Sequence, residues 1–215
     1  MLDATLIIPQ HNQFQLTTAT LSTLLHWHQS LPEILLIDDH SQPQHIKRFR
    51  KSLPSSVQWF HSPKRGLTNA WRFGASLASQ SSLLFLNNDV ITTGPWIPEL
   101  VTAIENASHT IHGIHFRNQK IQHLTTKVLQ GWCFGLSKTL YSQLNGFDSQ
   151  FQLYYSDTDL QFQHLLTTNT QQPLIAHSHL PLLHLAHKTT QHCPHRHQLH
   201  QADRRRFLTK WAPHD

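Results

Sequence analysis

Short apolar runs alternate with helical patterns along the first half of the chain, and this alternation limits the fold more than any other feature. Short, largely apolar runs of four residues, bounded by polar or turn residues, are typical of buried strands. They occupy residues 5–8, 34–37, 57–60 and 83–86. Between them, helical spacing of apolar residues predicts helices over 17–28, 45–52 and 68–79. Strands separated by helices predict an α/β fold with a parallel, doubly wound sheet.

The second half of the sequence is less regular. It predicts helices over 95–105 and 154–166, and strands over 111–116, 128–136 and 177–185. A chain of 215 residues is long enough to bury one proper core. Because no repeat or clear linker divides the sequence, we expect a single domain over residues 1–190, followed by a basic tail or helix over 191–215.

The composition limits the cellular compartments in which the protein is expected. The chain has 17 Lys and Arg residues, 12 Asp and Glu residues and two cysteines, which favours a reducing compartment over a disulfide framework. Its apolar runs are too short to span a bilayer and its start lacks a basic signal region, so we expect a cytoplasmic protein. The 20 histidines are interpreted as general replacement of surface carboxylates, rather than as a metal store.

The few acidic residues gather where a parallel sheet binds ligands, beyond the carboxyl ends of its strands. Six of the 12 lie in short clusters: Asp38, Asp39, Asp89, Asp148, Asp157 and Asp159. A carboxylate there can accept hydrogen bonds from a nucleoside, hold a divalent cation that also binds diphosphate, or act as a general base. Each cluster alone is more often an ordinary turn or helix cap. The pattern therefore depends on their combination.

In this order and spacing, the motifs resemble those of family 2 glycosyltransferases of the GT-A fold, over roughly residues 4–190. The motifs are LIIPQHN, ILLIDDHS, RGLTNA, LLFLNNDV, GWCFGLSK, LNGFDSQFQLYYSDTDL and LLHLAHKTT. GFD followed about ten residues later by DTDL is the most specific element. The LNND variant is similar to bacterial rhamnosyltransferase-like members. The resemblance implies a Rossmann-like parallel or mixed sheet flanked by helices.

The resemblance also implies roles for single residues. Asp38 would contact the nucleobase in a pocket lined by Pro9, and Asp157 would be the catalytic base. Asp89 and His184, the latter followed by Thr189, would bind Mg²⁺ or Mn²⁺ together with the diphosphate. Further nucleotide-sugar contacts would come from Asn12, Arg65, Asn87 and Asn88. From the residues alone, the Lys64-Arg65-Gly66 turn is equally compatible with a phosphate cradle and with a basic surface turn.

The implied activity is inverting transfer of a hexosyl or rhamnosyl group from a UDP- or dTDP-sugar to a glycan or lipid-linked acceptor, in cell-surface polysaccharide biosynthesis. Ser156 stands where the family has an acid, Gln163 and His164 where an Arg is usual, and Trp71 near a common Asn. These departures keep an alternative open, in which a degenerate GT-A domain serves as a binding or scaffold subunit. A nucleotidyltransferase is disfavoured because the turn after the first strand has no Gly.

Three further features allow alternatives. The cationic tail (Arg204, Arg205, Arg206, Lys210) also carries Phe207, Leu208 and Trp211, so it predicts either a helix packed on the domain or a contact with the inner face of an anionic membrane. Residues 192–197 with His200 are a less favoured Zn²⁺ site. Trp132 is interpreted as a core residue in preference to an acceptor contact. We expect no nucleic-acid partner, because no helix interleaves basic and aromatic residues.

Overall fold

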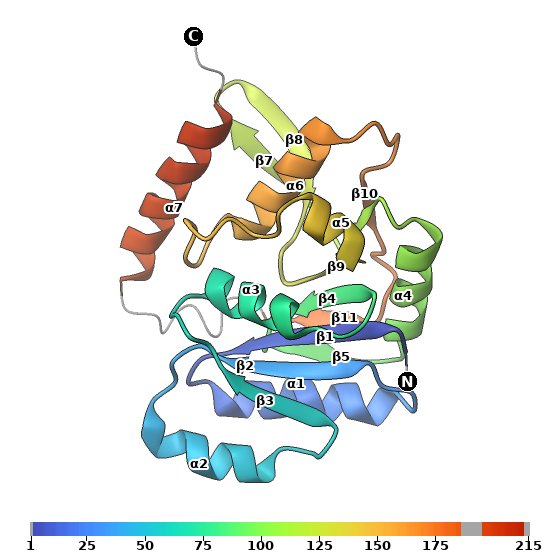
Figure 1. Ribbon diagram of the computed structural model, residues 1–215, viewed down its shortest axis with the longest axis vertical. Helices are drawn as coiled ribbons and strands as arrows, with labels where there is room; N and C mark the ends of the chain where they lie inside the picture. Colours follow the sequence, from blue (N-terminus) through green and yellow to red (C-terminus); the bar gives the residue numbers. More distant parts are fainter. Residues whose placement is uncertain (1, 186–194, 213–215) are drawn as a thin grey trace.

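The computed structural model describes residues 2–185 and 195–212, and its centre is a seven-stranded sheet with helices on both faces (Figure 1). The strand order is β10-β6-β9-β4-β1-β2-β3. These strands are β1 (Ala4–Gln10), β2 (Glu33–Asp38), β3 (Val57–His61), β4 (Ser82–Leu86), β6 (Ile111–Gly113), β9 (Cys133–Ser137) and β10 (Leu174–Ala176). Only β9 runs antiparallel to its neighbours in this sheet. The predicted α/β architecture with a parallel or mixed sheet is confirmed.

Helices cover both faces because the central strands are apolar on both sides. On one face lie α1 (Phe14–Trp27), α2 (Pro43–Ser52) and α4 (Ile97–Asn106), which pack with Leu6 and Ile8 of β1. On the other lie α3 (Leu67–Leu77), α5 (Lys138–Gln143) and α6 (Ser156–Thr167), which pack with Ile7 between those two residues. Successive residues of β1 thus enter opposite core layers, as the period of two of a strand requires.

Two small antiparallel sheets complete the fold. One pairs β5 (Val90–Thr92) with β11 (Leu182–His184), and the other is the hairpin of β7 (Phe116–Ile121) and β8 (Leu124–Leu129).

Three predicted strand boundaries are therefore wrong. The strands expected over 111–116 and 128–136 each divide in two, because the chain leaves the main sheet at this point to form the hairpin. A hydrogen bond of 2.8 Å from Gln130 N–H to His115 O connects the segment between β6 and β7 with the segment between β8 and β9. The strand expected over 177–185 is limited to β11, which begins directly after Pro181, a residue without a backbone N–H.

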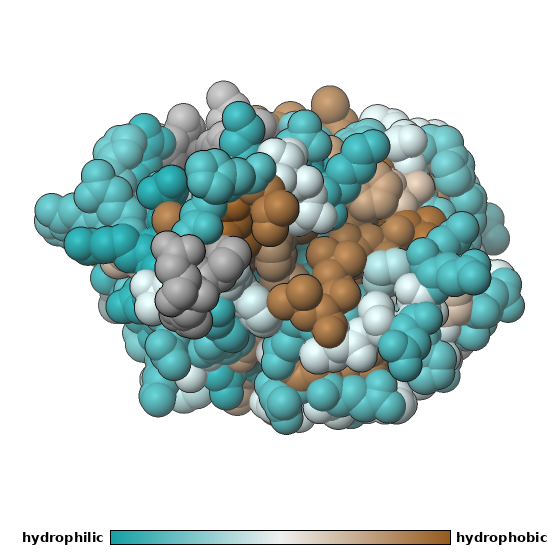
Figure 2. Space-filling model, turned by 90° about the horizontal axis from the view of Figure 1, so that it is seen from above, coloured by the Kyte–Doolittle hydropathy of each residue, from teal (hydrophilic) through white to brown (hydrophobic). Residues whose placement is uncertain are grey.

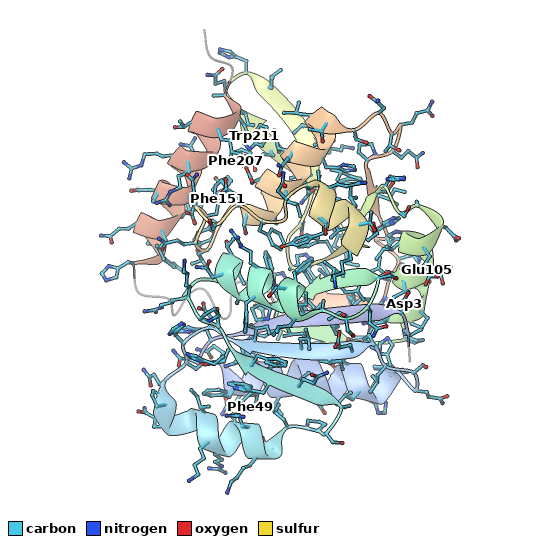
Figure 3. The ribbon with its side chains drawn as sticks, viewed as in Figure 1. Asp3, Phe49, Glu105, Phe151, Phe207 and Trp211 are labelled. Atoms are coloured by element: carbon cyan, nitrogen blue, oxygen red, sulfur yellow. The ribbon has the colours of Figure 1, made fainter. Side chains whose placement is uncertain are left out.

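The last helix, α7 (Arg196–Trp211), packs on the hairpin and on α6. Phe207 is fully buried and contacts Phe162 of α6 with ring centroids 5.1 Å apart. Figure 3 shows Phe207 and Trp211 pointing from α7 toward the body of the molecule. The prediction that the aromatic residues of this helix pack on the domain is confirmed for residues 196–211. Over the described ranges, no helix combines the length and apolar character needed to cross a membrane.

Candidate functional site

A cavity of about 1150 Å³ opens beyond the carboxyl ends of β1, β2 and β4. Seven of the nine predicted site residues line it: Pro9, Arg65, Asn87, Asn88, Asp89, Asp157 and His184. Asn12 and Asp38 are not among the described residues of its wall. The position of the cavity follows from the topology, because parallel strands of an open sheet present their carboxyl ends at one edge.

Asp89 and His184 meet across the small β5–β11 sheet, although 95 positions separate them in sequence. Asp89 directly precedes β5, and pairing of His184 with Val90 brings the imidazole beside the carboxylate. His184 Nε2 lies 3.1 Å from Asp89 Oδ1. The indole of Trp132 stacks on the His184 ring with centroids 5.1 Å apart, which fixes the ring plane. Trp132 is thus both a buried residue and part of the cavity wall.

This pair fits a divalent cation. Two adjacent ligands of an octahedral ion, each about 2.1 Å from it, lie about 3.0 Å apart, which is close to the observed Asp89–His184 separation of 3.1 Å. No group of three His, Cys, Asp or Glu side chains with metal-site geometry occurs within residues 2–185 and 195–212. Two protein ligands suit an ion that is completed by substrate phosphates and water. Thr189 lies outside the described residues.

Asn88 holds the turn between β4 and β5 through contacts with α1. This side chain is buried and its Nδ2 donates to Thr17 Oγ1 at 2.9 Å, while Thr20 Oγ1 donates to the Asn88 carbonyl at 2.9 Å. The backbone N–H of Asn87 donates to Trp132 O at 2.8 Å. These contacts tie the turn to α1 and to the loop before β9, and so fix the direction in which Asp89 points.

The acidic pair after β2 divides between the core and the cavity. Asp38 is fully buried and receives a hydrogen bond of 2.8 Å from His61 Nδ1. Asp39 lines the cavity and accepts the Gly66 N–H at 2.6 Å. Burial raises the pKa of Asp39, and the Gly66 N–H and neighbouring cationic groups only partly offset this effect. Asp38, which was expected to contact the nucleobase, therefore does not belong to the described cavity wall. Asp39 is the acid of this pair that faces the cavity.

Asn12 and the turn at Gly66 hold the loops that follow β1 and β2, and of the two only Gly66 belongs to the described cavity wall. Asn12 adopts a φ of 57°, receives the Gln42 N–H at 2.7 Å on its side-chain oxygen and donates its own N–H to Ser41 Oγ at 2.8 Å. It thereby joins the loop after β1 to the loop after β2. Gly66 has a φ of 118°, which favours glycine, and its N–H is engaged by Asp39. Of the Lys64-Arg65-Gly66 turn, the Arg65 side chain is exposed and reaches the cavity wall.

Asp157 lies in the first turn of α6, where the helix dipole favours a carboxylate. Its side chain is 15% exposed, and Arg117 Nη2 of β7 lies 3.9 Å from Oδ2. Burial raises the pKa of Asp157, and the Arg117 guanidinium opposes that rise. A side chain at Gly131 would overlap the Asp157 carboxylate, so glycine leaves the space that this group needs.

Other residues at or beside the cavity received no role from the sequence. Arg117 was missed because the β7–β8 hairpin was not expected. Asp39 was missed because two adjacent acids in a sequence do not show which of them faces the cavity. Asp159 is fully buried and receives Trp211 Nε1 at 2.8 Å and Lys210 Nζ at 2.9 Å. The apolar and aromatic part of the wall includes Tyr154, Tyr155, Leu199 and His200, from the α6 and α7 regions. No pattern in the sequence brings these two segments together.

The departures from the family pattern leave the cavity acids in place. Ser156 and His164 are buried, and Gln163 is partly exposed on α6. Trp71 stacks on Phe147 with centroids 5.3 Å apart and forms part of the cavity wall. The histidine-rich segment considered for Zn²⁺ falls partly outside the described residues, since 192–194 are not described.

The mixed sheet and the acidic cavity at its carboxyl edge define a GT-A glycosyltransferase fold. The family model "Glycosyl transferase family 2" matches residues 5–161, and the chain belongs to this family. No curated protein matches it in sequence.

Solved structures agree with the fold. A crystal structure of GalNAc-T7 with UDP, GalNAc and Mn²⁺ is similar with a TM-score of 0.69 and 17% identity, covering 86% of this chain and 44% of that one. The mannosyltransferase PcManGT from Pyrobaculum calidifontis, in complex with GDP-Man and Mn²⁺, has a TM-score of 0.59 and 14% identity, with 81% and 54% covered. The chain thus spans about half the length of these two proteins.

Proposed function

We propose that the protein is a metal-dependent, inverting glycosyltransferase that moves a sugar from a nucleoside diphosphate to an acceptor hydroxyl. The observation that carries the proposal is the shared cavity, in which the Asp89–His184 pair and the Asp157 carboxylate face the same space. Family membership supports this activity, and so do the two similar structures, one with UDP, GalNAc and Mn²⁺ and the other with GDP-Man and Mn²⁺.

Each cavity residue receives a role from its position. Asp39 would accept a hydrogen bond from the nucleobase beside Pro9, and Arg65 and Asn87 would contact the phosphates or ribose. Asp89 and His184 would hold Mg²⁺ or Mn²⁺, and such an ion would supply positive charge to stabilise the leaving diphosphate. Asn12 and Asn88 would support these contacts through the two loops and the turn that they hold together.

Asp157 would act as the general base. Its carboxylate takes the proton of the acceptor hydroxyl while that oxygen bonds to the anomeric carbon and the bond from this carbon to the diphosphate oxygen breaks. A single displacement of this kind inverts the anomeric configuration. Arg117 would favour the ionised carboxylate and so oppose the effect of burial, since a nearby cation favours the charged form.

The finer assignments complete the proposal. The donor would be a UDP- or dTDP-sugar that carries a hexosyl or rhamnosyl group, and the acceptor a glycan or lipid-linked saccharide of cell-surface polysaccharide biosynthesis. Peripheral contact with the inner face of an anionic membrane would place the enzyme near such acceptors. Exposed basic side chains on α2 and α7 support this contact.

The test combines nucleotide binding with transfer. Calorimetry should show that wild type binds UDP or dTDP more tightly with Mn²⁺ than without it, and that Asp89→Asn loses this difference. Asp157→Asn should retain Mn²⁺-dependent binding, while transfer falls about 10²- to 10⁴-fold as expected for loss of a general base.

Glu105→Gln is the matched control, because Glu105 is exposed on α4 and lies at the edge of the molecule in Figure 3. It should behave like wild type in both assays. Equal nucleotide affinity with and without Mn²⁺ in all proteins would contradict the metal assignment. Mn²⁺-dependent binding without transfer in wild type would favour the binding or scaffold subunit.

A further inference from the structure

The one acid among residues 196–211, Asp203 of α7, is completely buried and is used to hold a loop of the cavity. Its carboxylate accepts three consecutive backbone N–H groups, from Gln152 at 3.3 Å and from Leu153 and Tyr154 at 3.0 Å each. Arg206 Nη1 donates to the same carboxylate at 2.9 Å. Hydrogen bonds to a charged acceptor are about twice as strong as neutral ones, so this is a firm attachment of loop to helix.

The loop held by Asp203 leads directly into the first turn of α6. Gln152, Leu153, Tyr154 and Tyr155 all line the cavity, and Asp157 follows two residues later. Tyr155 has a φ of 65°, in the left-handed region that bulky side chains rarely adopt. Such a backbone persists only where the surroundings fix it. Here the Tyr155 ring stacks on Phe207 of α7 with centroids 5.1 Å apart.

A second contact from α7 reaches the other side of Asp157. Trp211 Nε1 donates to Asp159 Oδ1 at 2.8 Å, and Lys210 Nζ bridges Asp159 and Asp148. Burial raises the pKa of Asp159, whereas these two donors favour its charged form. Helix α7 therefore holds the chain before Asp157 through Asp203, and the chain after it through Trp211 and Lys210.

We propose that Asp203 is a positioning residue, which fixes the loop at residues 152–154 and so sets the direction of the Asp157 carboxylate, with Trp211 supporting it through Asp159. The inference rests on the proposed function, because it requires Asp157 to act on the acceptor. Asp203 lies on the last helix, beyond the family match at residues 5–161, and belongs to no motif of the resemblance. It does not line the described cavity wall, so its effect is exerted through the loop.

The main test is Asp203→Asn, which conserves volume but removes the charge and one acceptor oxygen. We expect kcat for transfer to fall by up to about 10²-fold, the loss typical of a misplaced catalytic group. The KM for the donor and the Kd for UDP with Mn²⁺ should stay at wild-type values. Hydrogen exchange should become faster at the amides of Gln152, Leu153 and Tyr154, while the amides of β1 and β2 remain protected.

Two further variants separate positioning from general loss of structure. Trp211→Phe keeps an aromatic ring but removes the donor to Asp159, and it should lower kcat less than Asp203→Asn does, again without a change in nucleotide affinity. Arg205→Gln is the control on the same helix, because this side chain is exposed and forms no ion pair among the described residues. It should match wild type in exchange and in transfer.

The inference is overturned if Asp203→Asn folds and keeps wild-type kcat, or if its nucleotide affinity and core protection fall together with kcat. If Asp203→Asn does not fold, an unchanged kcat in Trp211→Phe overturns the proposal. Absence of both Mn²⁺-dependent nucleotide binding and transfer in wild type would instead refute the proposed function, and the positioning role with it.

Discussion

At the scale of single residues, function depends on space and direction as much as on charge. The Asp157 carboxylate occupies the room that Gly131 leaves, and Asn88 fixes the turn that places Asp89 in the cavity wall. Asp38 and Asp39 are chemically identical neighbours, yet one serves the core and the other the cavity. Residue type alone therefore does not assign a role in this site.

Gly131→Ala is predicted to impair transfer without weakening donor binding. The added methyl group would overlap the Asp157 carboxylate and force it to move. Because displacement of a catalytic group by about 1 Å can cost about 10²-fold in rate, we expect a loss of this order in kcat. Steady-state kinetics, with calorimetric nucleotide affinity as the internal control, provides the measurement. Wild-type kcat in this variant would show that Asp157 tolerates displacement and weaken its assignment as base.

Asp39→Asn and Asp38→Asn form a matched pair with opposite expected results. Loss of a charged hydrogen bond costs about 1.5–3 kcal/mol, so Asp39→Asn should weaken nucleotide affinity by roughly 10- to 10²-fold with little change in stability. Asp38→Asn should lower the free energy of unfolding, because it replaces the charged acceptor of His61 with a neutral amide, and should leave affinity unchanged. Calorimetry and urea unfolding of both variants check this. The reverse result would return the nucleobase contact to Asp38.

At the scale of elements, the sequence predicts best what local pattern encodes. The first four strands and the helices between them follow from apolar runs and helical spacing, and the acids at the strand ends mark the cavity edge. The β7–β8 hairpin was missed because residues 116–127 are largely polar and exposed, so they show no buried strand pattern. The attachment of α7 through Asp203 was missed because its partners are backbone N–H groups about 50 residues away, which leave no sequence signature.

The β7–β8 hairpin contributes a cation to the site, and this predicts the pH dependence. Asp157 must be ionised to act as a base, so transfer should decline as pH falls through its pKa, which burial raises above the ordinary value of about 3.9 for Asp. Arg117→Gln removes the cation that opposes this rise, so the pKa increases further and the acid limb of the kcat profile moves to higher pH.

Lys120→Gln, exposed on the same strand, is the control for this shift and should leave the profile unchanged. Profiles of kcat against pH for the three proteins are the measurement. A limb that stays in place in Arg117→Gln would show that the titrating group is not Asp157.

At the scale of the whole molecule, basic charge is distributed unevenly. On α7, Arg206 pairs with Asp203 and Lys210 with Asp148 and Asp159, whereas the exposed Arg204 and Arg205 form no ion pair with the part of the chain that the structure describes. On α2, Lys47, Arg48, Arg50 and Lys51 are exposed, and none of the four forms an ion pair within residues 2–185 and 195–212. Figure 1 places these helices at opposite ends of the molecule.

Besides the basic surfaces of α2 and α7, the molecule has an exposed hydrophobic surface. In Figure 2, hydrophobic residues gather near the middle of this face and hydrophilic residues surround them. Leu124 of the hairpin and Leu166 of α6 are among the exposed large hydrophobic side chains of the protein, at 64% and 69%. Basic and apolar groups together suit a membrane surface, where charge attracts the protein and apolar side chains enter the interface.

Binding to anionic vesicles should depend more on α2 than on α7. Each basic residue near an anionic surface contributes about 1 kcal/mol. With α2 facing the surface, replacement of its four cations by Gln should weaken binding by about 10³-fold. Arg204→Gln with Arg205→Gln, at the opposite end of the molecule, should change binding little. The shared side-chain exposure of these positions makes the two variants comparable, and the fold should survive both. Truncation before Phe207 is unsuitable as a test, because it would open the core beneath α7.

Co-sedimentation with phosphatidylserine vesicles at low salt measures the effect, with phosphatidylcholine vesicles and high salt as controls, since salt screens exposed charges. If wild type does not sediment with anionic vesicles at low salt, the membrane contact is refuted. If the α7 variant loses more binding than the α2 variant, the contact lies on the side of the molecule formed by α7 and the hairpin.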